Sequence, residues 1–243
     1  MIGCLLLHGY TGGPFEVDPL KEFLEEETNW QVVVPVLEGH GEQLHLDGAT
    51  YETWLKDAED ALEELRKECS TVYVIGFSMG GMIASYLAAT QKVDKLVLLA
   101  AARRYISVKY LGHYFGEVIT DGIAGNLDEN EWYANYKDKI GEVPFKANLE
   151  FIRLVHFTKP YLEKITAPTF IVQGMKDEMV PYKTAYTLEE EIGSELKQVV
   201  LFEKSDHLIC LGDEGPVVNR LVLQFLQTDE NQEKEETTKE RVQ

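Results

Sequence analysis

Short apolar runs that alternate with segments of helical periodicity constrain the fold of this chain most. Six runs have the length and composition of β-strands: residues 2–7, 31–35, 71–75, 95–100, 168–173 and 198–203. Most are apolar at consecutive positions, so we expect these strands to be buried on both faces. Residues 51–68 and 218–226 instead repeat apolar side chains every three or four positions, which is typical of amphipathic helices. The pattern predicts an α/β fold, with a mostly parallel sheet of about six strands and helices on both faces.

Residues 101–165 interrupt this alternation. The segment has no strand-like run of valine and isoleucine, is longer than an ordinary connection, and holds 11 of the 25 aromatic residues. We predict a mostly helical insertion over one end of the sheet; the alternative is an ordinary helical layer with its own core. The sheet domain then comprises residues 1–100 and 166–227. The tail, 228–243, has almost no apolar residues and is expected to be disordered.

The composition excludes several classes of protein. With 243 residues, 44% of them hydrophobic, the chain can bury a core as one globular body. Its net charge of −19 repels polyanions, so we expect no nucleic-acid partner. No apolar run approaches the roughly 18 residues of a membrane span, and run 2–7 lacks the flanks of a secretory signal. Nothing in the sequence indicates the oligomeric state.

The cysteines indicate the compartment. Their number is odd, they are far apart, and they show no metal-ligand spacing: Cys4, Cys69 and Cys210. This usage predicts reduced thiols in a cytoplasmic protein that binds no metal. We also expect no organic cofactor.

The strongest chemical motif is Gly76-Phe77-Ser78-Met79-Gly80, between strand 71–75 and the helical segment 82–90. A serine in a sharp strand-to-helix turn adopts strained backbone angles, and flanking glycines remove the Cβ atoms that would collide. The turn exposes the hydroxyl, directs the Met79 N–H toward an incoming carbonyl, and places both at the positive end of a helix. The motif predicts that Ser78 is a nucleophile. The alternative is a serine merely packed in a tight turn.

A neutral serine hydroxyl needs a general base. His207 is the best candidate because it comes just after the last predicted strand, where a side chain reaches the carboxyl edge of the sheet. His8 and His40 lie beside glycines and are expected to organise loops. Three other histidines remain open as alternatives: His45, His113 and His156.

The base in turn needs an acid that orients it. Asp177 follows strand 168–173, and open α/β sheets place their sites at this edge. An aspartate on the second ring nitrogen would fix the histidine tautomer and stabilise the imidazolium. Glu178 and Asp206 are nearby competitors for this role.

A glycine-rich loop, His8-Gly9-Tyr10-Thr11-Gly12-Gly13, follows the first strand. Its glycines allow the backbone to approach a reacting carbonyl closely. We expect the N–H groups of Tyr10 and Met79 to form an oxyanion hole, which is usually worth several kcal/mol of barrier.

These motifs together resemble a known family. HGYTGG at 8–13, EGHG at 38–41, GFSMGG at 76–81, DEMVP at 177–181 and DH at 206–207 look like the bacterial carboxylesterase and monoacylglycerol lipase branch of the α/β-hydrolases. The resemblance covers about 1–227, and the chain order Ser78, Asp177, His207 agrees with it. It implies a triad of these three residues, an oxyanion hole from Tyr10 and Met79, and a helical cap at 101–165 over an acyl pocket. The chain departs from the family pattern in one respect: the one or two edge strands that usually precede the first loop are missing.

The function expected from the resemblance and the motifs is that of a serine carboxylesterase acting on short- to medium-chain esters. The neutral, aromatic-rich insertion favours a small apolar ester as partner. A monoacylglycerol lipase, or a thioesterase, acyltransferase or amidase with the same triad, remains an alternative. A non-catalytic ligand-binding protein of the same fold is a further alternative.

Overall fold

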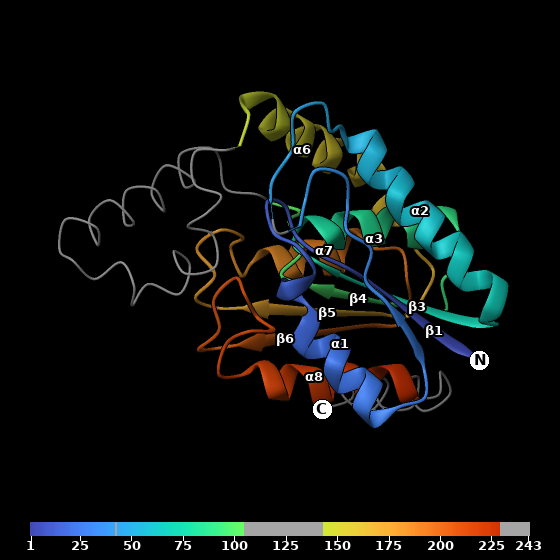
Figure 1. The fold of residues 1–243 in the computed structure, drawn as a ribbon. Coiled ribbons are helices and arrows are strands. Elements are labelled where there is room, and N and C mark those ends of the chain that lie inside the picture. Colours follow the sequence, from blue (N-terminus) through green and yellow to red (C-terminus); the bar gives the residue numbers. More distant parts are fainter. Residues whose placement is uncertain (42, 105–142, 229–243) are drawn as a thin grey trace.

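The computed structural model describes residues 1–41, 43–104 and 143–228, which form a parallel sheet flanked by helices (Figure 1). The sheet has six strands in the order β2-β1-β3-β4-β5-β6, and every neighbouring pair is parallel. The strands are β1 (Ile2–Leu7), β2 (Gln31–Val33), β3 (Thr71–Phe77), β4 (Lys95–Leu99), β5 (Thr169–Gly174) and β6 (Lys197–Phe202). The predicted fold class is confirmed. The edge strand β2 is two residues shorter than predicted, whereas β3 continues two residues further, to Phe77.

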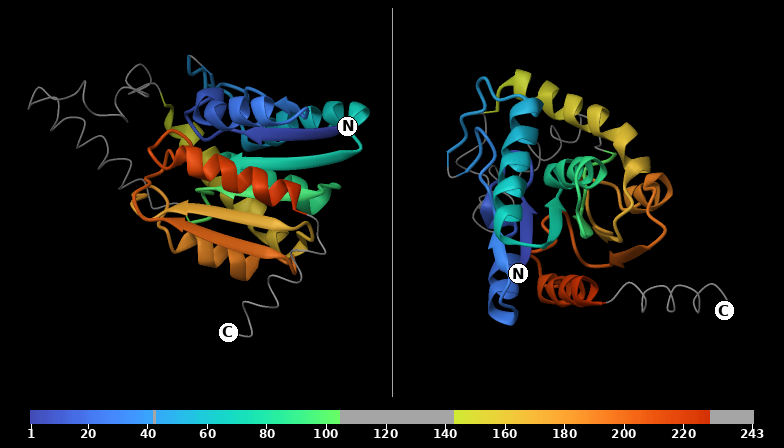
Figure 2. Two further views of the ribbon diagram at one scale, coloured as in Figure 1. Left: turned by 90° about the horizontal axis from the view of Figure 1, so that it is seen from below. Right: turned by 90° about the vertical axis from the view of Figure 1, so that its right-hand side faces the viewer.

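Helices cover both faces of the sheet (Figures 1 and 2). On one face lie α1 (Asp18–Glu27) and α8 (Gly215–Gln227); on the other lie α2 (Tyr51–Glu68), α3 (Met79–Thr90), α6 (Phe145–Thr158) and α7 (Thr184–Glu191). Alternate side chains of each central strand enter the two cores. In β1, Leu5 and Leu7 pack with α2 and α3, while Cys4 and Leu6 pack with α1 and α8. This burial on both faces explains the continuous apolar runs.

Helix α2 begins and ends where its periodicity predicts. Its N-cap Thr50 accepts a hydrogen bond from the backbone N–H of Thr53, whose side chain accepts one from the N–H of Thr50. This reciprocal cap satisfies two donors at the helix start. Trp54 and Leu62 lie on the buried stripe that faces the sheet.

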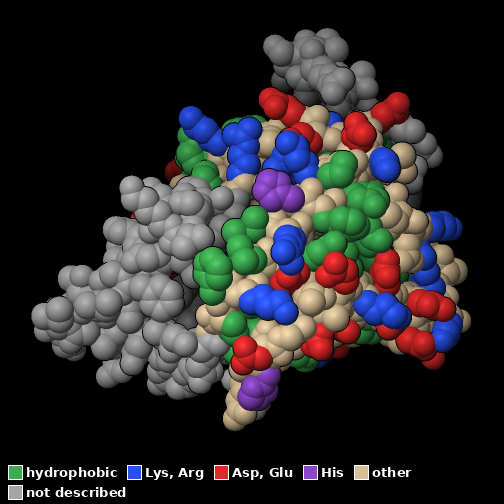
Figure 3. Space-filling model, turned by 90° about the horizontal axis from the view of Figure 1, so that it is seen from above, with side chains coloured by type: hydrophobic (Ala, Val, Ile, Leu, Met, Phe, Trp, Pro, Cys, Tyr) green, Lys and Arg blue, Asp and Glu red, His purple; other side chains and the backbone are tan. Residues whose placement is uncertain are grey.

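Helix α6 and the 3₁₀ helix η4 (Lys159–Lys164) are the described part of the predicted insertion after residue 142. Phe151 and Leu154 of α6 belong to the core cluster that also holds side chains of α2 and α3. On its outer side Phe145 is 73% exposed, and Leu149 and Ile152 are also exposed. Figure 3 looks onto this face and shows apolar side chains among both basic and acidic ones. Residues 105–142 of the cap predicted over 101–165, and residues 229–243 of the disordered tail predicted over 228–243, lie outside the described residues.

In the described ranges, no helix combines the length and the apolarity that a membrane span requires.

Candidate active site

Ser78 connects β3 directly to α3 through a strained backbone conformation. Strand β3 ends at Phe77, α3 begins at Met79, and Ser78 between them has φ 52° and ψ −114°. Few L-residues adopt such angles, because the side chain crowds the backbone. Three hydrogen bonds hold the turn: the Ser78 N–H donates to the Leu99 carbonyl at 2.9 Å, and the Ser78 carbonyl accepts from the N–H groups of Gly81 and Ala102, each at 3.0 Å.

The glycines of the motif are required by close backbone packing. A Cβ at Gly76 would lie 2.2 Å from the carbonyl oxygen of Gly80, and a Cβ at Gly80 would lie 2.3 Å from that of Leu7. The second contact places the start of α3 directly against the end of β1. Because tertiary packing stabilises them there, Gly80 and Gly81 lie in the first turn of α3. The helix therefore begins at Met79, three residues before its predicted start at residue 82.

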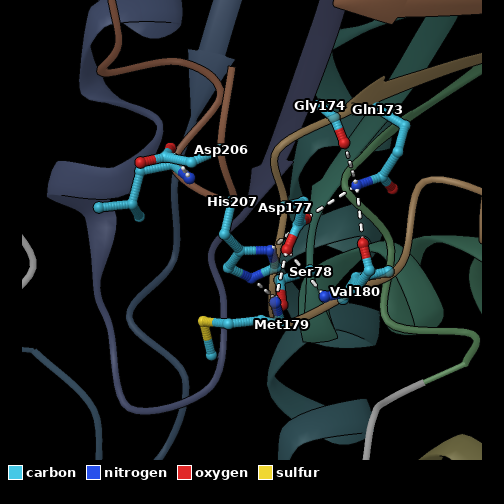
Figure 4. Close-up of polar contacts among 9 residues, drawn as sticks. Ser78, Gln173, Gly174, Asp177, Met179, Val180, Asp206 and His207 are labelled. Atoms are coloured by element: carbon cyan, nitrogen blue, oxygen red, sulfur yellow. Dashed lines mark hydrogen bonds and ion pairs between the residues drawn. The ribbon is translucent and has the colours of Figure 1, made fainter. Parts of the chain in front are cut away.

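His207 connects Ser78 to Asp177 by hydrogen bonds (Figure 4). Its Nε2 lies 2.9 Å from Oγ of Ser78, and its Nδ1 lies 2.8 Å from Oδ2 of Asp177. His207 follows β6 and Asp177 follows β5, so the carboxyl ends of three parallel strands bring these residues together. All three predicted triad positions therefore meet in one buried cluster, and the serine hydroxyl has a proton acceptor in place.

The Asp177 carboxylate is fixed by three further donors. Its Oδ1 accepts from the backbone N–H groups of Met179 and Val180, each at 2.8 Å. Its Oδ2 accepts from Nε2 of Gln173 at 2.8 Å, and this amide group also donates to the Val180 carbonyl at 3.2 Å. Gln173 was not predicted; its only sequence signal is an amide at the end of an otherwise apolar strand.

Two opposing effects set the pKa of His207. Burial alone would lower it, but the charge and hydrogen bond of Asp177 outweigh burial and, together with the charges of Glu16 and Asp206, raise the pKa of His207 above its usual 6.5. The environment therefore favours the protonated, imidazolium form of His207.

The two competing acids are both solvent-exposed, whereas Asp177 is buried. Glu178 is exposed, and Asp206 is an exposed residue whose Oδ1 accepts from the backbone N–H of Leu208 (Figure 4). Of the other histidines, His45 is exposed, His156 lies on α6, and His113 falls outside the described residues.

The loop after β1 lies beside this cluster. A Cβ at Gly80 would approach the His8 carbonyl oxygen to 2.6 Å, and one at Gly9 would approach the Phe77 ring to 3.0 Å. The His8 ring organises the loop as expected: its Nε2 accepts from the Leu37 N–H at 3.1 Å, so its Nδ1 donates to the Gly9 carbonyl at 2.9 Å.

Tyr10, in the same loop, is anchored through its side chain. Its ring stacks on Phe151 of α6, with centroids 4.9 Å apart and planes 5° apart, and its hydroxyl donates to Oδ1 of Asn148 at 3.2 Å. Trp54 of α2 contacts the Tyr10 ring edge-on. The position of this loop is thereby coupled to α2 and α6.

Glu16 is a buried carboxylate that sequence analysis missed. It ends the 3₁₀ helix η1 (Pro14–Glu16), is 2% exposed, and accepts hydrogen bonds from backbone N–H groups of the loop. Its burial has no signal in the sequence, because a glutamate shortly before a helix is usually solvent-exposed.

Within the described part of the chain, no three or more His, Cys, Asp or Glu side chains are grouped in a way that could hold a metal ion.

Comparison with known proteins agrees with this architecture. Residues 3–214 match the family model described as serine aminopeptidase, S33. A thermostable monoacylglycerol lipase of Bacillus sp. (strain H-257) is 28% identical over 240 residues, which cover 92% of this chain and 90% of the relative. A carboxylesterase of Bacillus subtilis is 28% identical over 241 residues, which cover 92% and 91%.

The fold is also similar to solved structures. A structure reported with LipS and LipT, two metagenome-derived lipolytic enzymes, superposes with a TM-score of 0.76 at 20% identity, covering 93% of each chain. The family match spans the loop after β1, the Ser78 turn, Asp177 and His207. The chain therefore belongs to the serine aminopeptidase S33 family, in the esterase and lipase branch of the α/β-hydrolases.

Proposed function

We propose that this protein is a serine carboxylesterase that hydrolyses short- to medium-chain carboxylic esters through an acyl-enzyme on Ser78. The observation that carries the proposal is the unbroken hydrogen-bonded series from the Ser78 hydroxyl through His207 to Asp177. In this series each group has the partner that nucleophilic catalysis requires.

In the first half-reaction, Oγ of Ser78 attacks the ester carbonyl carbon while Nε2 of His207 takes the hydroxyl proton. Asp177 holds the ring through Nδ1 and stabilises the imidazolium. The carbonyl oxygen becomes an oxyanion, which the backbone N–H groups of Tyr10 and Met79 would bind. When the tetrahedral intermediate collapses, His207 returns the proton to the leaving alcohol.

In the second half-reaction, water replaces the alcohol. His207 takes a proton from the water, the hydroxide adds to the acyl carbon, and the Ser78–acyl bond breaks to release the carboxylic acid. Ser78 recovers its proton from His207. The cycle uses only side chains and backbone groups of this chain.

Two observations support an apolar ester as the substrate. Two relatives that align over nine-tenths of the chain are a carboxylesterase and a monoacylglycerol lipase. Helix α6, whose Phe151 and Asn148 contact Tyr10, also exposes apolar side chains on its outer face. A helical cap over residues 101–165 remains part of the proposal, as does a cytoplasmic location, which three free buried cysteines support.

Monoacylglycerol lipase activity is the second candidate. The Bacillus relative of that name is as similar to this chain as the carboxylesterase is. The exposed apolar side chains of α6 also suit a long acyl chain.

The proposal is tested with p-nitrophenyl esters whose acyl chains run from two to sixteen carbons, using the wild type and Ser78→Ala. Activity that peaks between four and ten carbons and disappears in Ser78→Ala supports the carboxylesterase. A maximum at longer chains, with hydrolysis of 1-monoacylglycerols, supports the lipase. A folded Ser78→Ala variant with ordinary turnover contradicts both. Inactivity of the wild type on every ester favours thioesters or amides, or a binding role.

A further inference from the structure

The Glu16 side chain bridges the two ends of the loop that contains Tyr10. Its Oε2 accepts a hydrogen bond from the Gly9 N–H at 2.8 Å and another from the Gly13 N–H at 3.3 Å. Tyr10 lies between these two positions. Because two N–H donors converge on one carboxylate oxygen, they fix the span of the loop.

The loop is shaped around this carboxylate. A Cβ at Gly12 would lie 2.0 Å from Oε2 of Glu16, so only a glycine leaves room for the carboxylate. A Cβ at Gly9 would also approach Oε2, to 3.2 Å. Thus Gly9 and Gly13 donate hydrogen bonds to Glu16 from the two ends of the loop, and Gly12 leaves space for its carboxylate.

Glu16 also lies close enough to act electrostatically on the base. Its charge raises the pKa of His207, as do the charges of Asp177 and Asp206, while the pKa of the buried Cys210 thiol responds to Glu16 as well. The imidazolium that forms on His207 thus has a second buried carboxylate nearby, contributed by an element remote from Asp177 in the sequence.

We propose that Glu16 is a positioning residue: it ties Gly9 to Gly13, and thereby holds the backbone N–H of Tyr10 where the oxyanion forms. Its charge additionally stabilises protonated His207 in the transition state. This inference rests on the proposed function, because it assigns Glu16 a task in the same acyl transfer.

Two variants perturb Glu16 in different ways, one by removing its charge and the other by displacing its carboxylate. Glu16→Gln keeps the size of the side chain and one acceptor oxygen but removes the charge. Gly12→Ala leaves Glu16 in place but displaces its carboxylate, and the flexible Glu16 side chain can move to accommodate the added methyl group. If one variant does not fold, the other still tests the proposal.

Asp94→Asn is the matched control. The Asp94 carboxylate also accepts a backbone hydrogen bond, from the Val72 N–H at 2.7 Å, but near the opposite end of β3 from Ser78. This substitution makes the same change in charge without touching the loop or His207. We expect it to leave kcat and the pH profile unchanged.

The readouts are kcat and KM for an ester, the pH dependence of kcat/KM, and the rate at which a fluorophosphonate labels Ser78. Loss of one oxyanion donor typically lowers kcat by about 10²–10³, so partial displacement of Tyr10 should lower kcat and the labelling rate by about 10- to 100-fold. KM should change less than about twofold, because the interaction is made in the transition state. In Glu16→Gln the acidic limb of the kcat/KM pH profile should move to lower pH, because the charge that raises the pKa of His207 is lost. A purely structural role of Glu16 would leave this limb in place.

The proposal is overturned if the folded variants keep the wild-type labelling rate and kcat, or if kcat falls with no change in the acidic limb of Glu16→Gln. Labelling depends on the nucleophile and the oxyanion hole but not on the natural substrate. A wild type that is labelled at Ser78 yet hydrolyses no ester therefore contradicts the proposed function alone. Normal labelling of both variants contradicts the role of Glu16 alone.

Discussion

The strained backbone at Ser78 predicts that glycine is more stable than alanine at this position. Ser78 has φ 52° and ψ −114°, and both substitutions remove the hydroxyl and its hydrogen bond to His207. The difference between the two variants therefore reports the cost of placing a Cβ in this conformation. Such strain costs about 1–3 kcal/mol, which glycine relieves.

Glycine also gives the unfolded chain more freedom, which offsets about 0.4–1 kcal/mol of that gain. We expect the unfolding free energy of Ser78→Gly to exceed that of Ser78→Ala by about 1.3 kcal/mol, the middle of the resulting range. For a chain of this length, that difference raises Tm by about 3–5 °C.

The assay is thermal and urea unfolding of both variants, followed by circular dichroism. Ser85 provides the control, because it is also buried in α3 but has a helical backbone, and its hydroxyl donates to the Gly81 carbonyl. There glycine should be less stable than alanine, by about 1 kcal/mol. If Ser78→Gly is less stable than Ser78→Ala by about 1 kcal/mol, as expected for glycine against alanine at Ser85, the backbone at Ser78 is not strained.

Three further predictions follow from the same geometry. Because His207 accepts a proton only when neutral and its pKa is raised, kcat/KM should fall as the pH drops through an apparent pKa above 6.5; an acidic limb at or below that value would contradict the assigned charges. Gly80→Ala should lower the free energy of unfolding, measured in urea, by about 3 kcal/mol, because the new Cβ meets the Leu7 carbonyl. Gly212→Ala, whose Cβ has nothing within 4 Å, should leave it nearly unchanged, and equal losses in the two variants would refute the packing argument. Burial raises the pKa of Cys210 to about 12, and Cys4 and Cys69 are buried as well, so the native protein should resist a thiol reagent at pH 8. The unfolded protein should react at all three cysteines, and rapid labelling of the native form would contradict their burial.

The fold could be predicted from the sequence because its strands are buried on both faces. Strand β1 begins and ends as its apolar run predicts, and so does the periodic helix α2. The errors lie where tertiary contacts decide. Strand β3 continues through Gly76 to Phe77 because Phe77 still pairs with Leu99 of β4, although glycine usually weakens a strand.

That the three residues of the proposed triad meet could be predicted for a topological reason. Ser78, Asp177 and His207 each follow a strand, and parallel strands end at one edge, so residues distant in sequence meet there. Gln173 and Glu16 could not be predicted in the same way. Both act through buried hydrogen bonds, and a sequence does not reveal which polar residues are buried together.

The central claim, that Ser78 is the nucleophile of an ester hydrolase, is tested most directly by labelling the protein with a fluorophosphonate while ester hydrolysis is followed. We predict one label per chain, located by peptide mass spectrometry on Ser78, and loss of activity in proportion to labelling. Full activity in completely labelled protein, or a label on another residue, would contradict the claim.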